Sequence, residues 1–202
     1  MGIEQGMENR RLRAVLFDRD GTLIRDVPYN GDPDLVEPMP GAAESVALLH
    51  ARGVAVGVVT NQSGIARGLI TAEQVDAVNE RVDRLVGQID VWAVCPHGEG
   101  DGCGCRKPAP GLILEAMARL GVEPHEVAVV GDIGRDIQAA SAAGCRSVLV
   151  PTPITLESEV EAATEVATTL ADAVAMLLEP NAEPAERAEH AEAPGTRREP
   201  VS

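Results

Sequence analysis

The 202-residue chain is poor in lysine, in aromatic residues and in long apolar runs. Aromatic residues make up 1% of it, so a core has to be built from Val, Leu, Ile and Ala. No stretch approaches the roughly 18 apolar residues that a membrane-spanning helix needs, and the N-terminus lacks the apolar stretch of a signal peptide. We therefore expect a cytoplasmic protein with no membrane partner.

An excess of positive charge is also missing. The formal net charge is −15 at pH 7, which argues against nucleic acid and anionic membrane surfaces as partners. The length suits a single domain with a substantial core, and we expect a monomer. The composition predicts an N-terminal arm over 1–11, a folded domain over 12–179 and a disordered tail over 180–202, where Pro, Ala, Glu and Arg dominate.

Short apolar runs alternate with helical patterns along the chain. The runs are continuously apolar, as in parallel strands that are covered on both faces. This order predicts an α/β protein with a three-layer, doubly wound parallel sheet, whose ligand crevice lies at the carboxyl ends of the strands. The expected strands are 13–17, 54–59, 90–94, 127–130, 146–150 and a weak one near 165–170; the expected helices are 41–51, 71–87, 111–120, 135–143, 155–163 and 171–178.

Two aspartates separated by one residue follow the first apolar run. Asp18 and Asp20 stand in Phe17-Asp18-Arg19-Asp20-Gly21-Thr22. Side chains at positions i and i+2 of an extended chain leave it on the same side. Holding two carboxylates together is costly unless a cation lies between them or one carries a proton. The pattern predicts a Mg²⁺ site with a carboxylate nucleophile rather than two surface aspartates in a turn.

Polar residues also follow the later strands. Thr60 and Asn61 come at the end of the second run, Cys95 after the third and Asp132 after the fourth. The carboxyl ends of parallel strands meet at one edge of the sheet. We therefore expect these side chains to share one site.

Lys107 is the only lysine among the 17 Lys and Arg residues of the chain. Lysine carries a compact point charge, whereas arginine carries a planar fork, and the two do not substitute for each other at a tight phosphate or carboxylate site. A lysine that persists in an arginine-rich chain, just before an expected helix, indicates such a site.

Three of the four cysteines lie close to a histidine in the sequence. Cys95, His97, Cys103 and Cys105 supply three thiolates and an imidazole, which is the ligand set of a closed tetrahedral Zn²⁺ site. Four protein ligands leave no open position, so we expect a structural zinc that pins this loop just before Lys107. A redox dithiol formed by Cys103 and Cys105 is the competing interpretation. Cys145 is expected to be a buried, small apolar residue.

The order of these motifs resembles the haloacid dehalogenase (HAD) superfamily of phosphohydrolases, over roughly residues 13–150. The resemblance implies that a carboxylate attacks phosphorus to give an aspartyl-phosphate, that a second carboxylate acts as acid and base, and that Mg²⁺ is the cofactor. The implied site comprises the catalytic residues Asp18, Asp20, Thr60 and Lys107, the substrate-binding residue Asn61, and the Mg²⁺ ligands Asp18, Asp20 (through its backbone carbonyl) and Asp132. Asp136 would orient the water ligands of the metal or Lys107.

Further details narrow the resemblance. The segment 61–68, the zinc loop and Cys105-Arg106-Lys107-Pro108 resemble the family of D-glycero-D-manno-heptose 1,7-bisphosphate 7-phosphatases and histidinol-phosphatases. The heptose branch implies hydrolysis of the 7-phosphate of a sugar bisphosphate in nucleotide-activated heptose biosynthesis. Ile133 stands where this family often has lysine. Arg67 and Arg106 are therefore expected to bind the substrate, with Arg135 as a further cation.

The intervals between Asp18, Thr60 and Lys107 are too short for a separate cap domain, so the loop over 24–39 is the main candidate for contact with the substrate. Two alternatives stay open. One is a phosphatase of histidinol phosphate or of another small metabolite. The other is a zinc-stabilised interaction domain without activity, against which the intact set of carboxylates and Lys107 argues.

Overall fold

The computed structural model describes residues 11–179. The expected tail over 180–202 lies outside the described residues, as does the expected N-terminal arm apart from Arg11. Within the described part, no helix is long and apolar enough to cross a membrane.

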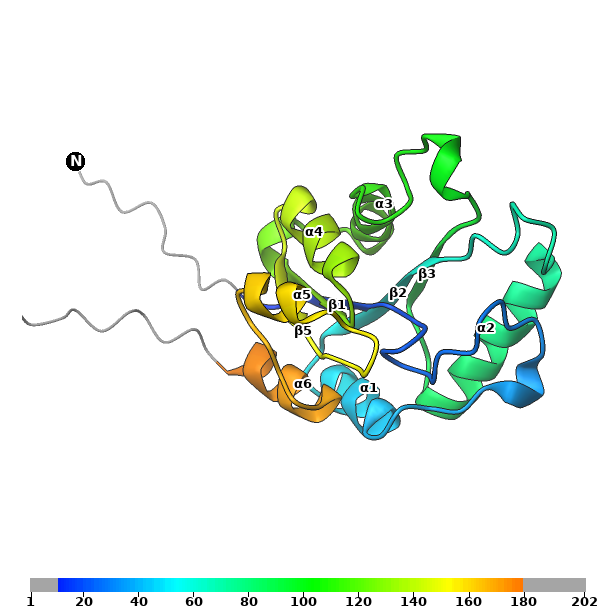
Figure 1. Cartoon of the computed structure of the whole chain (residues 1–202). Helices are drawn as coiled ribbons and strands as arrows, with labels where there is room; N and C mark the ends of the chain where they lie inside the picture. Colours follow the sequence, from blue (N-terminus) through cyan, green and yellow to red (C-terminus); the bar gives the residue numbers. More distant parts are fainter. Residues whose placement is uncertain (1–10, 180–202) are drawn as a thin grey trace, which may run out of the picture.

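A five-stranded, fully parallel sheet forms the centre of the molecule, in the order β3-β2-β1-β4-β5 (Figure 1). The predicted doubly wound sheet is confirmed, and each strand starts and ends within two residues of its expected position. The strands are β1 (Ala14–Phe17), β2 (Ala55–Asn61), β3 (Val91–Cys95), β4 (Val127–Gly131) and β5 (Arg146–Leu149).

Helices cover both faces of the sheet, which gives the predicted three layers (Figure 1). On one face lie α1 (Ala42–Ala51), α2 (Ala72–Val86) and α6 (Leu170–Leu178); on the other lie α3 (Gly111–Leu120) and α4 (Gly134–Ala143), with the short α5 (Glu157–Ala162) beside α4. Short 3-10 helices stand at Pro33–Leu35, Glu99–Asp101 and Pro124–Glu126.

The strand β1 shows how one apolar run serves two cores. Its side chains alternate: Val15 and Phe17 pack with α1, α2 and α6, whereas Ala14 and Leu16 pack with α3 and α4. All four are fully buried. A continuous apolar run is therefore required here, because each face of the strand is covered by helices.

The prediction of a weak strand near 165–170 is wrong. This segment makes one isolated parallel bridge, between Val166 and Leu149 at the end of β5. Thr169 then caps α6, with its side chain accepting a hydrogen bond from the backbone N–H of Asp172. The pairing with β5 therefore ends after this one bridge, and the chain turns into α6.

The described residues contain no inserted cap domain. The connection from β1 to β2 holds one 3-10 helix and α1, and the connection from β2 to β3 holds α2. The helix α2 begins with a capping box in which Thr71 and Gln74 satisfy each other's backbone N–H groups. The carboxyl ends of the strands are therefore covered only by loops, as predicted.

Candidate active site

The two central strands bring the expected carboxylates together. In the register of β1 and β4, Phe17 lies beside Val130, and the backbone N–H of Asp18 donates to the Val130 carbonyl at 2.9 Å. Asp18 and Asp132 therefore leave adjacent strand ends. This is the point where the strand order reverses across the sheet, which is where open α/β sheets place their ligands.

Lys107 lies at this switch point, between the carboxylates of Asp18 and Asp136. Its Nζ is 2.5 Å from Asp18 Oδ1 and 2.6 Å from Asp136 Oδ1, and it also donates to the Val59 carbonyl at 2.7 Å. The side chains of Lys107 and Asp136 are 3% and 1% exposed, so this ion pair is screened very little by water. Burial alone would lower the pKa of Lys107, but Asp136 and Asp18 outweigh it and raise that pKa above its ordinary value.

The carboxylates carry more negative charge than one lysine balances. Burial, together with the nearby Asp136 and Asp20, raises the pKa of Asp18 to about 8, although Lys107 opposes the shift. Burial and Asp136 likewise raise the pKa of Asp132 to about 7. A divalent cation would relieve both effects, since it favours the ionised form of each carboxylate.

The arrangement fits a hard divalent cation. One carboxylate oxygen each from Asp18, Asp132 and Asp136 lie within 4.8 Å of one another, and an all-oxygen donor set suits Mg²⁺. Gly21, at φ +86°, leaves room for this group, because a Cβ there would lie 2.3 Å from Asp132 Oδ2. Asp136 Oδ1 is buried, and the Lys107 ammonium lies 2.6 Å from it.

Asp20 and Thr60 lie at the same edge of the sheet, where both side chains bond Gln62 and not Lys107. Gln62 Nε2 donates to Asp20 Oδ2 at 2.8 Å and to Thr60 Oγ1 at 2.9 Å. The Thr60 hydroxyl accepts this bond, so its own hydrogen is available to another acceptor. The Asp20 carboxylate is also held by Arg19, and the expected contact of its backbone carbonyl with Mg²⁺ stays a prediction.

Asn61 is the last residue of β2, and its side chain forms two hydrogen bonds with the backbone of Lys107. Its Nδ2 donates to the Lys107 carbonyl and its Oδ1 accepts from the Lys107 N–H, both at 3.1 Å. Asn61 thus positions the lysine, while its expected contact with a phosphoryl group stays a prediction.

A cavity of about 200 Å³ opens in front of these side chains, and a neighbouring one of about 500 Å³ shares Arg106, Lys107 and Arg135 with it. Arg67 lines neither cavity: it donates to the Tyr29 hydroxyl at 2.6 Å and lies over that ring. The smaller cavity is lined by Asp18, Asp20, Asp26, Asn61, Arg106, Lys107, Asp132, Ile133, Arg135, Asp136 and Ile154. The 24–39 loop thus reaches it through Asp26.

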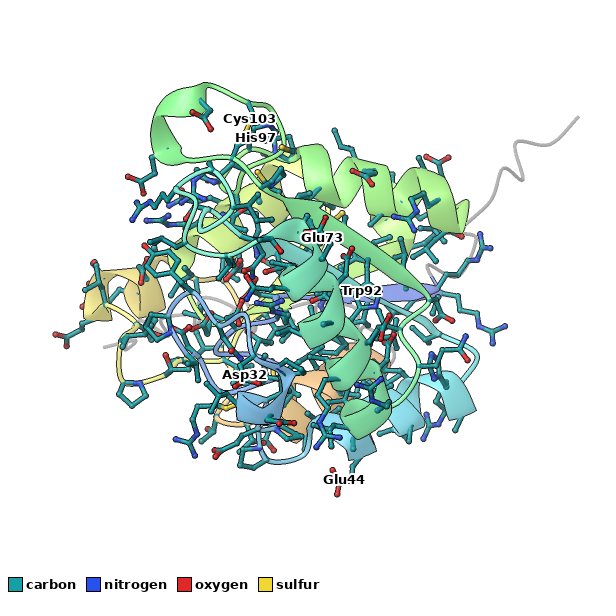
Figure 2. The ribbon with its side chains drawn as sticks, turned by 90° about the vertical axis from the view of Figure 1, so that its right-hand side faces the viewer. Asp32, Glu44, Glu73, Trp92, His97 and Cys103 are labelled. Carbon is teal, nitrogen blue, oxygen red and sulfur yellow. The ribbon has the colours of Figure 1, made fainter. Side chains whose placement is uncertain are left out.

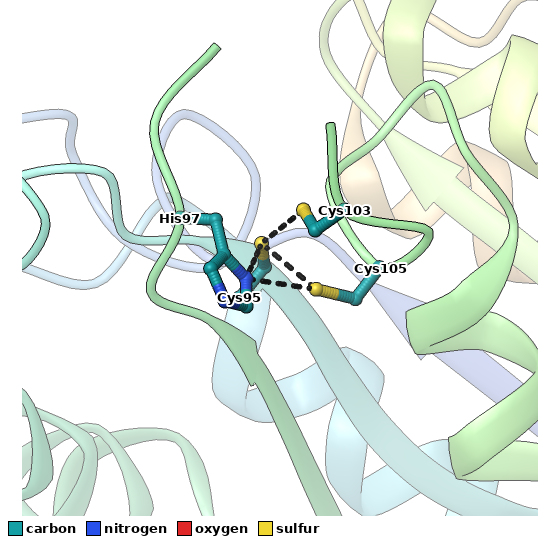
Figure 3. A group of neighbouring side chains, drawn as sticks. All are labelled: Cys95, His97, Cys103 and Cys105. Carbon is teal, nitrogen blue, oxygen red and sulfur yellow. Dashed lines mark hydrogen bonds between the residues drawn. The ribbon is translucent and has the colours of Figure 1, made fainter. Parts of the chain in front are cut away.

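The four expected zinc ligands converge at the end of β3, whose last residue is Cys95 (Figure 3). Two of them, His97 and Cys103, lie side by side in Figure 2. Their ligand atoms all lie within 4.8 Å of one another, with 3.8 Å between the sulfurs of Cys95 and Cys103 and 3.2 Å between His97 Nδ1 and Cys105 Sγ. The cysteines are free thiols, and their separations far exceed the roughly 2.05 Å of a disulfide. Tetrahedral thiolates around zinc lie about 3.8 Å apart, given Zn–S bonds of about 2.3 Å.

Several residues around the site were not predicted from the sequence as site residues. Arg19, Gln62 and Asn79 form hydrogen bonds behind Asp20. Thr155 donates from Oγ1 to the Asp132 carbonyl at 2.6 Å. Asn79 had a readable sign, because it interrupts the apolar stripe of α2, but Thr155 lies in a loop that has no recognisable pattern.

The sheet, the paired aspartates and the buried lysine define a hydrolase of the HAD class. Residues 104–177 match the HAD-hydrolase-like family model. The D-glycero-beta-D-manno-heptose-1,7-bisphosphate 7-phosphatase of Bordetella bronchiseptica is 38% identical over 146 residues, which are 70% of this chain and 82% of that protein. The corresponding protein of Pseudomonas aeruginosa is 39% identical over 143 residues, which are 68% of this chain and 80% of that one.

A solved structure agrees with these relatives. The crystal structure of D,D-heptose 1,7-bisphosphate phosphatase from B. bronchiseptica, complexed with magnesium and phosphate, matches with a TM-score of 0.73 and 33% identity, over 83% of this chain and 98% of that one. The chain therefore belongs to the D-glycero-D-manno-heptose 1,7-bisphosphate 7-phosphatase family of HAD hydrolases. The predicted superfamily and its heptose branch are both confirmed.

Proposed function

We propose that the protein is a Mg²⁺-dependent phosphatase that removes the 7-phosphate of a D-glycero-D-manno-heptose 1,7-bisphosphate, in the synthesis of nucleotide-activated heptose. The observation that carries the proposal is the position of Asp18, which is buried at the switch point beside Asp132 and paired with Lys107. Magnesium, held by Asp18, Asp132 and the Asp20 carbonyl, would neutralise phosphate charge and orient the group for attack.

The reaction has two halves. In the first, a carboxylate oxygen of Asp18 attacks phosphorus, the bond from phosphorus to the sugar oxygen breaks, and Asp20 gives that oxygen its proton. In the second, Asp20 takes a proton from water as the water oxygen attacks the same phosphorus. Inorganic phosphate leaves and the Asp18 carboxylate is restored, so that atoms and protons balance over one turnover.

Lys107 and Thr60 stabilise charge during both halves. The Lys107 ammonium already contacts the attacking carboxylate, so it faces the phosphoryl oxygens as soon as these arrive. The Thr60 hydroxyl keeps its hydrogen for a phosphoryl oxygen because it accepts from Gln62. Asn61 holds the Lys107 backbone in place.

The second phosphate of the substrate needs cations away from the metal. Arg106 and Arg135 line both cavities, and both approach Glu99 Oε1, at 3.7 and 3.4 Å. A phosphate dianion would replace that shared carboxylate, and it offers more acceptors to two arginine forks. Arg67, which Tyr29 holds elsewhere, contributes less to this proposal than the sequence analysis expected.

We also propose that Cys95, His97, Cys103 and Cys105 hold one structural Zn²⁺. The convergence of three thiols and one imidazole nitrogen supports this, and a closed four-ligand set leaves no position for catalysis. We further propose that the enzyme acts as a monomer, because its length suits a single domain with a substantial core.

The test compares three substrates with purified enzyme and Mg²⁺: the heptose 1,7-bisphosphate, the heptose 7-phosphate and histidinol phosphate. Charge-assisted hydrogen bonds contribute about 1.5–3 kcal/mol, so the bisphosphate should exceed the monophosphate in kcat/KM by about 10- to 100-fold. Arg106→Ala should erase most of this difference, whereas Arg84→Ala, on the exposed side of α2, should leave it unchanged.

Other outcomes assign other functions. A clear preference for histidinol phosphate would favour that phosphatase, and low, equal rates would indicate another small phosphorylated metabolite. No hydrolysis even of an aryl phosphate with Mg²⁺ would favour a zinc-stabilised interaction domain.

A further inference from the structure

Arg19 is a charged residue in an unusual position. It stands between the two aspartates of the site, yet it is only 1% exposed, and it is the largest fully buried side chain of the described residues. Burying a guanidinium is costly unless its N–H groups are bonded. Its partners therefore show what the residue is for.

The guanidinium of Arg19 joins the helix α2 to the carboxylate of Asp20. Its Nη1 donates to Asn79 Oδ1 at 2.8 Å. Its Nε lies 3.2 Å from Asp20 Oδ2, and its Nη2 lies 3.2 Å from Oδ1 and 3.1 Å from Oδ2. Two sides of the planar fork are thus fixed, one by the amide and one by the carboxylate.

Gln62 holds the same carboxylate from the strand side. Its Nε2 bonds Asp20 Oδ2 and Thr60 Oγ1 at once. This amide orientation follows from chemistry, because the opposite one would point the Gln62 oxygen at the carboxylate. Gln62 and Asn79 are each 6% exposed, so neither exchanges its bonds freely with water.

We propose that Arg19, Asn79 and Gln62 are positioning residues that fix the direction in which Asp20 exchanges its proton. The inference rests on the proposed acid and base role of Asp20. Each carboxylate oxygen has two lone pairs. Donors behind the group leave the lone pairs on the cavity side for the proton, which must reach the leaving oxygen and later come from water. Within this network Asn79 bonds Arg19, and Arg19 in turn bonds Asp20, which lines the cavity. Asn79 itself does not line the cavity.

The experiment uses leaving groups that need the proton to different degrees. A sugar alkoxide must be protonated as it leaves, whereas 4-nitrophenolate leaves without help. Asn79→Leu removes the acceptor of Arg19 with the same number and branching of side-chain heavy atoms, and Asn79→Asp keeps an oxygen acceptor. The first-step rate constant is measured by rapid quench for the heptose bisphosphate and by the nitrophenolate burst for 4-nitrophenyl phosphate.

A displaced catalytic group costs up to about 100-fold in rate. Asn79→Leu should therefore slow the first step on the sugar by about 10- to 100-fold and leave the nitrophenolate burst within about twofold of wild type. KM for both substrates should stay within about threefold. Asn79→Asp should restore most of the sugar rate, and Glu80→Ala, on the exposed face of the same helix, should change neither rate.

An equal loss on both substrates, or no loss on either, would overturn the proposal. If Asn79→Leu does not fold, Asn79→Ala is measured in the same way with the same criteria. Asp20→Asn separates the two hypotheses: if it shows no selective loss on the sugar substrate, the proposed role of Asp20 itself fails, whatever the Asn79 variants do.

Discussion

Replacement of Lys107 by methionine tests the electrostatic account of the site most directly. Among residues 11–179, Lys107 is the one cation in contact with Asp18 and Asp136, whose side chains are 12% and 1% exposed. Lys107→Met keeps a long apolar stem but leaves both carboxylates without that cation. Removing one partner of a buried ion pair costs about 3–5 kcal/mol, a large part of the roughly 5–15 kcal/mol by which domains are stable.

The assay is urea unfolding in Mg²⁺-free buffer, followed by the fluorescence of Trp92, the only tryptophan. The transition should move to lower urea at an unchanged slope, since the buried surface is the same. Added Mg²⁺ should stabilise Lys107→Met more than wild type, because the ion then faces carboxylates that no lysine neutralises.

The matched control is Arg25→Met. Arg25 also forms an ion pair, with Glu37 at 2.8 Å, but the two side chains are 70% and 67% exposed. Exposed pairs contribute about 0–1 kcal/mol. If Lys107→Met loses no more stability than this control, the carboxylates do not depend on the lysine and the reasoning is refuted.

Three further outcomes are expected. Asp18→Asn should fold normally, by circular dichroism, yet release no phosphate, because an amide of the same shape does not form an acyl-phosphate; turnover by the folded variant would exclude Asp18 as nucleophile. Elemental analysis should find one zinc per chain, and its removal by a chelator should lower the melting temperature, since the binding free energy of a structural zinc is folding free energy; metal-free protein with a Cys103–Cys105 disulfide would favour the redox dithiol. Burial raises the pKa of the Cys145 thiol to about 11, so at pH 8 it should stay neutral and unlabelled by a maleimide until urea is added; rapid labelling of the native protein would show that it is accessible.

The fold was predictable because each strand is covered on both faces. Continuous apolar runs such as 127–130 are required by that burial. Glycines such as Gly121 and Gly144 end the helices that lie between the strands. The segment 165–170 was wrongly predicted as a strand, because a single bridge to β5 and a full strand can have the same local composition.

The site was predictable where chemistry coincides with a strand end, as for Asp18 and Asp132, because parallel strands end at one edge. The residues that bond Asp20 from the side away from the cavity were not predictable. Asn79 lies in the middle of α2, 60 residues from Arg19, and no local pattern pairs the two. Its sign in the sequence is a polar residue among Val75, Val78 and Val82, which predicts a buried partner but does not identify it.

The cysteine cluster and the buried lysine are connected through the ends of β2 and β3. Cys95 is the last residue of β3 and lies in register with Asn61, the last residue of β2. Cys103 and Cys105 converge on Cys95, which brings the next residues of the loop over the end of β2, and there Asn61 bonds both backbone groups of Lys107. A glycine-rich loop has little core of its own, so metal at the cluster would supply the rigidity that holds a lysine against two buried carboxylates. Under the proposed zinc site, the cluster would hold the lysine from outside the cavity without taking part in the chemistry, while Arg19 bonds Asp20 from the side away from the cavity.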